Sequence, residues 1–595
     1  MKRKCMGILV LAAFICTAVL LATGCNRASE ATASGVTKSS HEALTLDMPY
    51  KDIDAFIDKV HEKYPEINID PIPYVGQNTT GWMRAMLKSG ELPDIYFTTQ
   101  YSPEVDEVSD KLLDLSSLPC TDQYVQARLR DVTVDGAVYM LPLSYGCIGI
   151  TYNKTLLEKN GWTLPKSLKE MEELKPKVEA AGYTFCVDLM QYPGYGFQYL
   201  CNILDTGFLS TSDGLRWQHD YLSKTANVSS TPKMLENMQL LARWKELGLL
   251  TSAHSDAADA DTRAFYKEGN TLFCLGNTND ISKEDGTDEY KLMPYLSEDG
   301  DQNVFILNVN RYVGLNKKLG DAGNEQKLED AKHVLEVLST EEGMWALNDQ
   351  RGSALLPLES ADVEPSSYYS EALDDLNHGH TAPFIYAGWD DVIVPIGNTM
   401  LDYIRNEATL QDVIDCIDEN QSTLDKGEVF TTVTKTLDTE HCARLVGLCF
   451  AQASGADVAL ISEGAYHPKT HNTNPDGVYG SLFALPVKEQ EIVTILPTGW
   501  DGHIETVTLS GARVKELAKD GYDRSGEGDT FPYVLVTKEG MTLEDTKNYK
   551  VAICGAAEEV QKEGKMQDSG IVGLDAMKDY LRTFDAISPE NLVWK

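Results

Sequence analysis

Histidine and aspartate pairs are the side chains whose spacing could hold a metal ion. His467 and His471 stand four residues apart, but Pro468 between them opposes a helix that would bring both to one ion. The segment 501–503 is a lone Asp-Gly-His, far from any domain-opening strand. Two-metal hydrolysis needs clustered Asp, His and Asn ligands, and nucleophilic catalysis needs a Ser-His-Asp or Cys-His arrangement. We find neither in the local sequence, so we expect no catalytic residue, no metal and no cofactor.

Glycine-rich phosphate loops are missing from the sequence as well. Neither GxxxxGK[ST] nor GxGxxG occurs, which gives no support to nucleotide hydrolysis or dinucleotide binding. The chain has 12 cysteines, three of them within residues 1–25. An odd number remains, scattered without CxxC spacing, so neither a disulfide framework nor a zinc site is indicated.

The composition is strongly acidic. The chain has 595 residues, with 52 Lys and Arg against 91 Asp and Glu, and a formal net charge of −39. This length predicts two to four domains, and 42% apolar residues can fill large cores. Nucleic acid is held by clustered Lys and Arg, so the acidity excludes it as an expected partner.

The first 25 residues have the pattern of an export signal. Lys2, Arg3 and Lys4 precede a long uncharged apolar run, which is typical of a secretory signal peptide. A transmembrane helix is the alternative, because the run is about long enough to span a bilayer. The run ends in Leu-Ala-Thr-Gly-Cys at 21–25, which resembles a bacterial lipobox. The resemblance implies a signal peptide over 1–24, a lipidated Cys25, and a flexible tether over 25–42.

Alternating apolar runs and helical periodicity predict an α/β architecture after the tether. Residues 43–48 read as a strand, and 52–64 as a helix with Phe56 and Val60 on its apolar face. A second helix over 79–88 is stopped by Gly90, and 94–97 is again a strand.

Several segments resemble, in order and spacing, the extracellular solute-binding proteins of ABC importers, in the branch that includes sugar binders. The resemblance spans about 380 residues. Each segment alone is a weak indication of the family, whereas the whole set in this order is a specific one. The segments are LPDI at 92–95, KLLDL at 111–115, DGAVYMLP at 135–142, ITYNK at 150–154, LLEKNGW at 156–162, FYKEGN at 265–270, AKHVLEVLSTEEG at 331–343 and TLQDVI at 409–414.

The resemblance implies a periplasmic-binding-protein-like fold over residues 43–428, with two α/β lobes joined by hinge strands. The crossing segments would lie near 144–152, 270–279 and 308–313. A ligand would bind in the cleft, and the lobes would close over it by hinge motion. Closure desolvates the ligand, and only a ligand that fits both lobes stabilises the closed form.

Sugars present apolar ring faces and a rim of hydroxyls, so aromatic platforms and polar partners suit them. Such side chains are more often packed in a core than stacked on a ligand, and that alternative stays open for each of them. The candidates at positions where the family places ligand contacts are Asp47, Tyr101, Tyr145, Tyr192, Tyr195, Asn277 and Trp389.

The tail, residues 429–595, is long enough for a further α+β domain. A helix over 440–454 leads into a strand over 456–461, in an order that resembles the C-terminal domain of 5′-nucleotidases. That family has Asn-Gly-Gly and then Arg after this strand, whereas this chain has Ser462 and His467 at the matching places. Tyr466, His467 and Trp500 could form an altered pocket, and the alternative is a scaffold without that ligand. The Gly-Asn-His-[Asp/Glu] stretch of the catalytic domain is missing, so the tail is expected to be non-catalytic.

These observations predict a lipoprotein anchored to the outer face of the cell membrane that captures a small solute, with sugar favoured, and is not an enzyme. The partners would be an ABC permease and its ATPase. The alternative is a nucleotide- or nucleoside-scavenging protein, or a 5′-nucleotidase-like phosphohydrolase that uses the C-terminal domain.

Overall fold

The computed structural model of the chain describes residues 41–594 except 51, 102–107, 189–191, 252–267, 276–287, 352–353, 361–366, 386–387, 425–426, 465–469, 471, 475, 524–529, 556–559 and 561–562. The predicted signal peptide, Cys25, Asn277, Tyr466 and His467 therefore lie outside the described residues. All the elements below belong to one unit of the fold, residues 39–595. Within the described part, no helix combines the length and hydropathy needed to cross a bilayer.

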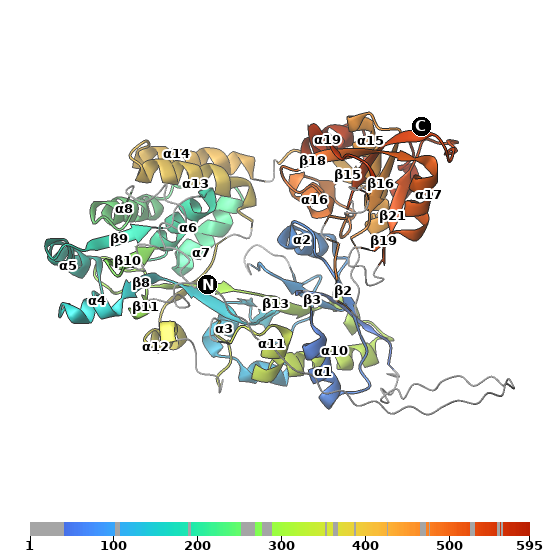
Figure 1. Ribbon diagram of the computed structural model, residues 1–595. Helices are drawn as coiled ribbons and strands as arrows, with labels where there is room; N and C mark the ends of the chain where they lie inside the picture. The colour runs from blue at the N-terminus through green and yellow to red at the C-terminus, as the bar shows by residue number, and fades with distance from the viewer. Residues whose placement is uncertain are drawn as a thin grey trace, which may run out of the picture. The chain divides into compact units, whose positions relative to one another are not determined.

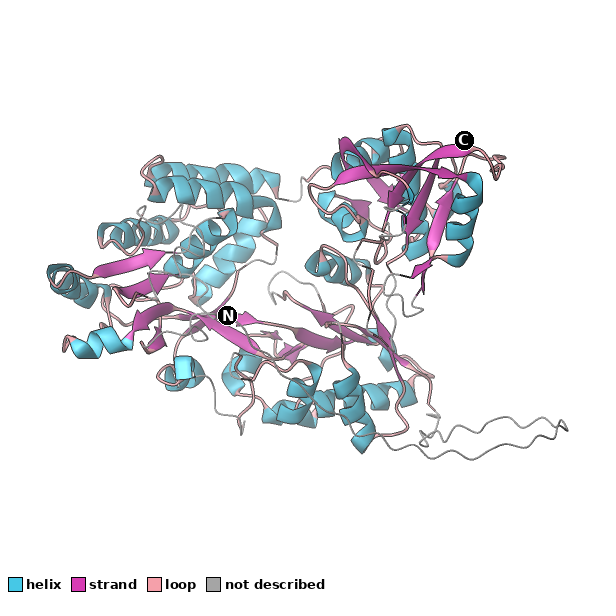
Figure 2. Ribbon diagram, in the orientation of Figure 1, coloured by secondary structure: helices cyan, strands magenta, loops and turns pink. Residues whose placement is uncertain are grey.

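A five-stranded sheet forms the centre of the first lobe (Figures 1 and 2). Strands β1, β2 and β3 are parallel to one another, whereas β13 runs antiparallel to β3 and β6. In spatial order the strands are β2 Ile69–Ile72, β1 Leu44–Asp47, β3 Ile95–Thr98, β13 Tyr312–Leu315 and β6 Leu141–Pro142. The predicted strands over 43–48 and 94–97 are confirmed.

Helices cover both faces of this sheet. The predicted helix over 52–64 is α1, which buries Phe56 and Val60, the residues that the sequence placed on its apolar face. The second predicted helix is α2, and it ends where Gly90 adopts a left-handed conformation with φ of 74°. The helices of this lobe are α1 Asp54–Lys63, α2 Thr79–Ser89, α3 Gln126–Arg130, α10 Glu325–Leu338 and α11 Glu341–Leu347.

The second lobe has a four-stranded sheet in the order β11 Tyr290–Met293, β8 Ile150–Asn153, β10 Thr271–Leu275 and β9 Thr184–Asp188. Its helices are α4 Lys154–Lys159, α5 Leu168–Ala180, α6 Pro193–Leu204, α7 Ser212–Leu222, α8 Pro232–Glu246, α13 Asp390–Ile404 and α14 Leu410–Asn420. Helices α6 and α13 cross at Gly397, where an added Cβ would lie 1.9 Å from the Pro193 carbonyl oxygen. Only glycine permits this close approach of two backbones.

Crossing segments join the two lobes, and a small sheet of β14 Thr381–Pro383, β12 Phe305–Val309 and β7 Tyr145–Ile148 lies among them. The chain passes from β6 through β7 into β8, and returns from β12 into β13, so the predicted crossings at 144–152 and 308–313 are confirmed. The prediction for 270–279 is wrong in its described part, because β10 pairs with β8 and β9 inside the second lobe. A third connection instead leaves α11 and returns through α12 Leu373–His378 to β14.

The C-terminal domain has a mixed five-stranded sheet in the order β21 Tyr533–Val536, β16 Val458–Ser462, β22 Asn548–Cys554, β18 His503–Ser510 and β23 Gln567–Val572. A smaller sheet contains β17 Pro486–Val487, β15 Thr431–Val433 and β24 Ala586–Ile587. The helices are α15 Thr439–Ser454, α16 Glu489–Ile495, α17 Gly511–Asp520 and α19 Gly573–Leu581. The predicted helix and strand at 440–461 are confirmed as α15 and β16.

Candidate ligand site at the crossing strands

A cavity of about 310 Å³ lies where the crossing strands enter the first lobe. Its volume is at the lower end of the range for small-molecule sites in proteins, roughly 300–1,000 Å³. Four parts of the chain line it: the first turn of α2, the residues after β3, the junction of β12 with β13, and the residue after β14. The lining residues are Thr80, Thr99, Gln100, Tyr101, Leu307, Asn308, Val309, Asn310, Arg311, Tyr312 and Phe384.

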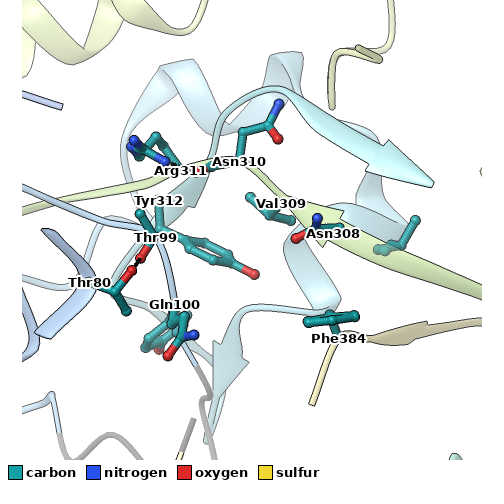
Figure 3. Close-up of a pocket in the computed structure, with 11 residues that line it drawn as sticks. Thr80, Thr99, Gln100, Asn308, Val309, Asn310, Arg311, Tyr312 and Phe384 are labelled. Carbon is teal, nitrogen blue, oxygen red and sulfur yellow. Dashed lines mark hydrogen bonds between the residues drawn. The ribbon is translucent and has the colours of Figure 1, made fainter. Parts of the chain in front are cut away.

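Hydroxyl and amide groups supply most of the polarity of the lining. The Thr80 and Thr99 hydroxyls are 2.8 Å apart and share a hydrogen bond between α2 and the end of β3 (Figure 3). The buried Gln100 Oε1 has no hydrogen-bond partner among the described residues. Figure 3 shows Asn308 on the side of the cavity opposite Thr80 and Thr99. Groups of this kind can donate hydrogen bonds to, and accept them from, a neutral polar ligand.

Aromatic rings supply the apolar part of the lining. The rings of Tyr101 and Tyr312 meet edge to face, with centroids 5.6 Å apart. In Figure 3 the Tyr312 ring extends from its strand toward Asn308 and Phe384. Phe384 is fixed at the cavity because its backbone N–H donates to the Leu307 carbonyl at 3.1 Å. An apolar ring face beside amides suits a ligand that has both apolar and hydroxylated surfaces.

Arg311 is the one charged residue among the lining residues that the structure describes. Its guanidinium donates to the backbone carbonyls of Asn310, at 2.7 Å, and Pro49, at 3.1 Å. It also lies over the Tyr50 ring, 5.0 Å from the centroid. Burial lowers the pKa of Arg311. In Figure 3 the guanidinium points away from Asn308 and Phe384, so its charge is directed at protein groups rather than across the cavity.

Asp47 lies at the carboxyl end of β1 and is fully buried. The Phe97 N–H donates to Asp47 Oδ1 at 2.6 Å, and Oδ2 has no hydrogen-bond partner among the described residues. Burial raises the pKa of Asp47 well above its ordinary value, against smaller lowering effects that include the charge of Arg311. Asp47 is therefore a buried neighbour of the Arg311 charge, and it is not among the residues that line the cavity.

Asn310 connects the cavity to all three crossing segments. Its side-chain Nδ2 donates to Ser144 Oγ, just before β7, and to Gln350 Oε1 in the third connection. Its backbone N–H donates to the Ser144 carbonyl at 2.9 Å. The residue that lines the cavity is thus also the residue at which the crossing segments are tied together.

The structure places the predicted site residues in different parts of the fold, and only some of them lie at the cavity. Tyr101 lines the cavity, and Asp47 lies buried close by. Tyr145 lies in β7 and is 3% exposed, in a separate apolar cluster, with its ring centroid 5.7 Å from the Arg128 guanidinium. Its backbone exchanges hydrogen bonds with Leu355, which ties β7 to the third connection.

Three further predicted residues lie in the second lobe. Tyr192 caps the start of α6 and is 59% exposed, with its ring centroid 6.2 Å from that of Tyr195. Trp389 is 6% exposed and stacks on Tyr221, with centroids 4.7 Å apart and planes at 5°. Trp389 therefore packs inside the second lobe in this structure, and it is absent from the cavity lining described above.

Trp500, the described member of the predicted C-terminal pocket, is 45% exposed on the C-terminal domain. It follows Gly499, where an added Cβ would lie 3.4 Å from the Gln77 side chain of the first lobe. Among the residues that the structure describes, no group of three His, Cys, Asp or Glu side chains is arranged to hold a metal ion.

Sequence reasoning missed most of the lining. Gln100 stands beside the predicted Tyr101, and Asn308 to Tyr312 fall inside a segment that was predicted to cross but was not assigned contacts. Three polar or charged side chains, Asn308, Asn310 and Arg311, stand at the junction of two otherwise apolar strands, and they were the available signal. Thr80 and Phe384 carried no such signal, because a helix start and a strand end do not reveal which cavity they face.

Comparisons with known proteins bear on the family and the fold of the two lobes. Residues 55–322 match the profile of a family described as bacterial extracellular solute-binding protein. No curated protein matches the chain.

Solved structures similar to this chain include a family 1 extracellular solute-binding protein from Bifidobacterium longum subsp. infantis, at 18% identity and a TM-score of 0.52. It aligns with 64% of this chain and 99% of its own. The putative binding protein MsmE from Bacillus subtilis, in an open conformation, has 14% identity and a TM-score of 0.51. The alignment covers 66% of this chain and 99% of the MsmE chain. The bacterial solute receptor AcbH is described as having an exclusive substrate preference for β-D-galactopyranose, and it has 12% identity and a TM-score of 0.51. The alignment covers 64% of this chain and 98% of the AcbH chain.

These likenesses define the class of the fold. The two lobes and their crossing strands are periplasmic-binding-protein-like, as the sequence predicted. The similar structures align over nearly their whole length with about two thirds of this chain, so the chain is substantially longer than the fold that they share.

Proposed function

We propose that the protein captures a neutral carbohydrate in the cavity at the crossing strands and delivers it to an ABC permease. The observation that carries this proposal is the lining: hydroxyls, amides and aromatic rings, with one arginine and no acid among the described lining residues. Hydroxyl and amide groups match a rim of sugar hydroxyls, and the Tyr312 and Phe384 rings suit an apolar sugar face. The preference of AcbH for a galactopyranose supports a sugar as the solute.

A neutral solute is favoured over a charged one because of the surroundings of Arg311. Its two terminal nitrogens donate to backbone carbonyls, and Asp47 lies buried near it. The guanidinium is turned toward these protein groups rather than across the cavity (Figure 3), and a cation would find no acid among the described lining residues. Uptake would be non-covalent, and a sugar that contacts both lobes would stabilise the closed form by differential binding.

The proposed location is the outer face of the cell membrane. A signal peptide over 1–24 would direct export and be cleaved before Cys25. The lipid on Cys25 would then anchor the chain, and residues 25–42 would tether the folded body. The permease and its ATPase are the proposed partners. Residues 429–595 are proposed to be a non-catalytic domain similar to the C-terminal domain of 5′-nucleotidases. Its support is the order of α15 and β16, together with the missing catalytic Gly-Asn-His-[Asp/Glu] sequence.

A thermal-shift screen of monosaccharides, oligosaccharides, nucleosides and polyamines tests the proposal. A ligand that binds the native state raises the melting temperature, and the rise grows with the ratio of the ligand concentration to its Kd. We expect a sugar to give the largest shift. A shift with nucleosides or polyamines alone would overturn the choice of solute. Metal-dependent release of phosphate from AMP by the purified protein would overturn the non-catalytic assignment of the tail.

A further inference from the structure

The first turn of α2 lies between the cavity and the C-terminal domain. On one side, Thr80 lines the cavity and shares a hydrogen bond with Thr99, which also lines it. Asn78 caps the start of the helix, and its side chain accepts a hydrogen bond of 2.9 Å from the Gly81 N–H. The position of Thr80 in the cavity therefore depends on how this first turn is held.

The C-terminal domain supplies hydrogen bonds to the other side of the same turn. The Asn78 side-chain Nδ2 donates to Gln490 twice, to the backbone carbonyl at 3.3 Å and to Oε1 at 3.0 Å. The Tyr74 hydroxyl donates to the Thr494 carbonyl at 2.7 Å and accepts from the Asn78 N–H at 3.3 Å. Gln490 and Thr494 are both residues of α16, so one helix of the C-terminal domain holds the start of α2.

Aromatic packing reinforces these hydrogen bonds. Trp82, on the next turn of α2, is 3% exposed and stacks on Tyr74 with centroids 4.6 Å apart. The ring of Tyr479, from the C-terminal domain, meets Tyr74 edge-on at 6.4 Å. Tyr479 and Phe483 belong to the hydrophobic core of the first lobe. Separation of the C-terminal domain would expose part of this core to water, so burial of these rings stabilises the contact.

We propose that the C-terminal domain positions the cavity wall: Tyr74 and Gln490 are positioning residues that fix the first turn of α2, and through it Thr80. The inference rests on the proposed function only in treating the cavity as a ligand site. It gives the domain a role in the shape of that site that needs no ligand of its own.

Hydrogen exchange of the full chain, measured by mass spectrometry with residue resolution, tests this proposal without any sugar. The amides of Asn78, Gly81 and Trp82 are the reporters, because they donate to Tyr74 Oη, Asn78 Oδ1 and the Asn78 carbonyl. We expect Tyr74→Phe to raise their exchange rates at least tenfold, and Gln490→Ala at least threefold. Amides of β3 should be unchanged, and Gln490→Glu, which keeps an acceptor for Asn78, should retain most of the protection.

Glu91→Ala is the matched control at the far end of the same interface. Glu91 accepts a hydrogen bond of 2.6 Å from the Thr436 hydroxyl, beyond the C-terminus of α2. Its loss should leave the three reporter amides within twofold of the wild-type rates. Unchanged reporters in Tyr74→Phe and Gln490→Ala would overturn the proposal. An equal rise in Glu91→Ala would also overturn it, by showing general loosening of the interface. Because no sugar is used, either failure is separate from failure of the ligand screen.

Discussion

The side chain of Asn310 donates a hydrogen bond of 3.0 Å to the Ser144 hydroxyl, and so joins two of the segments that cross between the lobes. A second hydrogen bond from the same amide, 2.8 Å long, reaches Gln350 in the third segment. Since Asn310 also lines the cavity, the cavity and the junction of the crossing segments share a residue. Under the proposed function, a ligand that contacts Asn310 would act directly on this junction between the lobes.

Asn310→Ala tests this junction. The substitution removes both hydrogen bonds, and we expect it to lower the free energy of unfolding by about 1–3 kcal/mol, since the Ser144 and Gln350 side chains lose a partner. Urea denaturation provides the measurement. Asn324→Ala is the control, because its side chain makes one exposed hydrogen bond to the Lys318 carbonyl and should cost less than about 0.5 kcal/mol. Equal losses in the two variants would contradict a special role for Asn310.

Trp389→Ala distinguishes core packing from ligand stacking. The side chain is buried against Tyr221 and Phe197 in the second lobe, so its removal should cost about 3–5 kcal/mol of stability. Tyr192→Ala is the companion variant, because an aromatic side chain that is 59% exposed should cost much less. Denaturant unfolding of both variants decides the question. A Trp389→Ala protein with wild-type stability and weakened sugar binding would return Trp389 to the ligand site.

The buried carboxyl of Asp188 should make the free energy of unfolding depend on pH. This residue lies buried at the end of β9, and burial raises the pKa of its carboxyl from 3.8 to about 7, although the Thr251 N–H donates to Oδ2. The folded state therefore holds the proton more tightly than the unfolded state, and stability contributed by the protonated acid is lost as pH rises from about 4 to about 7.

Asp188→Asn removes this titration while its amide keeps an acceptor for Thr251. Relative to wild type, we expect the variant to gain stability steadily between pH 4 and pH 7, by at most about 4 kcal/mol, since one pKa unit corresponds to about 1.4 kcal/mol. Urea unfolding of both proteins at half-unit pH steps measures the difference. A difference that does not change with pH would show that Asp188 titrates normally.

Gly480→Ala tests the packing of the C-terminal domain on Trp82. Gly480 has a φ of 70°, and an added Cβ would lie 3.0 Å from the Trp82 and Tyr74 rings. Gly540 has a φ of 75° with no atom within 4 Å of the added Cβ, so Gly540→Ala reports the backbone strain alone. We expect Gly480→Ala to be the less stable variant by about 1–3 kcal/mol, because the ring stack must shift. Equal melting curves would show that the contact with Trp82 is loose.

The sequence contains enough information to predict most local elements but not their partners. Phe56 and Val60 stand at helical spacing, and that spacing alone predicts the buried face of α1. Residues 271–275 form an equally clear apolar strand, yet its neighbours β8 and β9 are set by contacts distant in sequence. An apolar run does not encode which strand lies beside it, which is why the crossing predicted at 270–279 was wrong for residues 271–275.

The site was harder to predict for a related reason. Tyr101 and Trp389 are both aromatic residues that follow or precede regular elements, and sequence offers no means to tell the cavity ring from the core ring. The polar cluster at Asn308, Asn310 and Arg311 was a better signal, because half-buried polar groups at the junction of two apolar strands need partners. Thr80 reaches the cavity only through the tertiary placement of α2, which no local pattern records.

Isothermal titration of the purified protein with the sugar that gives the largest thermal shift is the most direct test of the proposed capture site. We predict saturable binding with one site and recovery of the sugar chemically unchanged. Gln100→Ala and Asn308→Ala should each weaken affinity about tenfold, the equivalent of about 1.4 kcal/mol, while Asn324→Ala leaves it unchanged. A folded protein that binds none of the sugars, or one whose affinity is the same in all three variants, would contradict the assignment of this cavity as the ligand site.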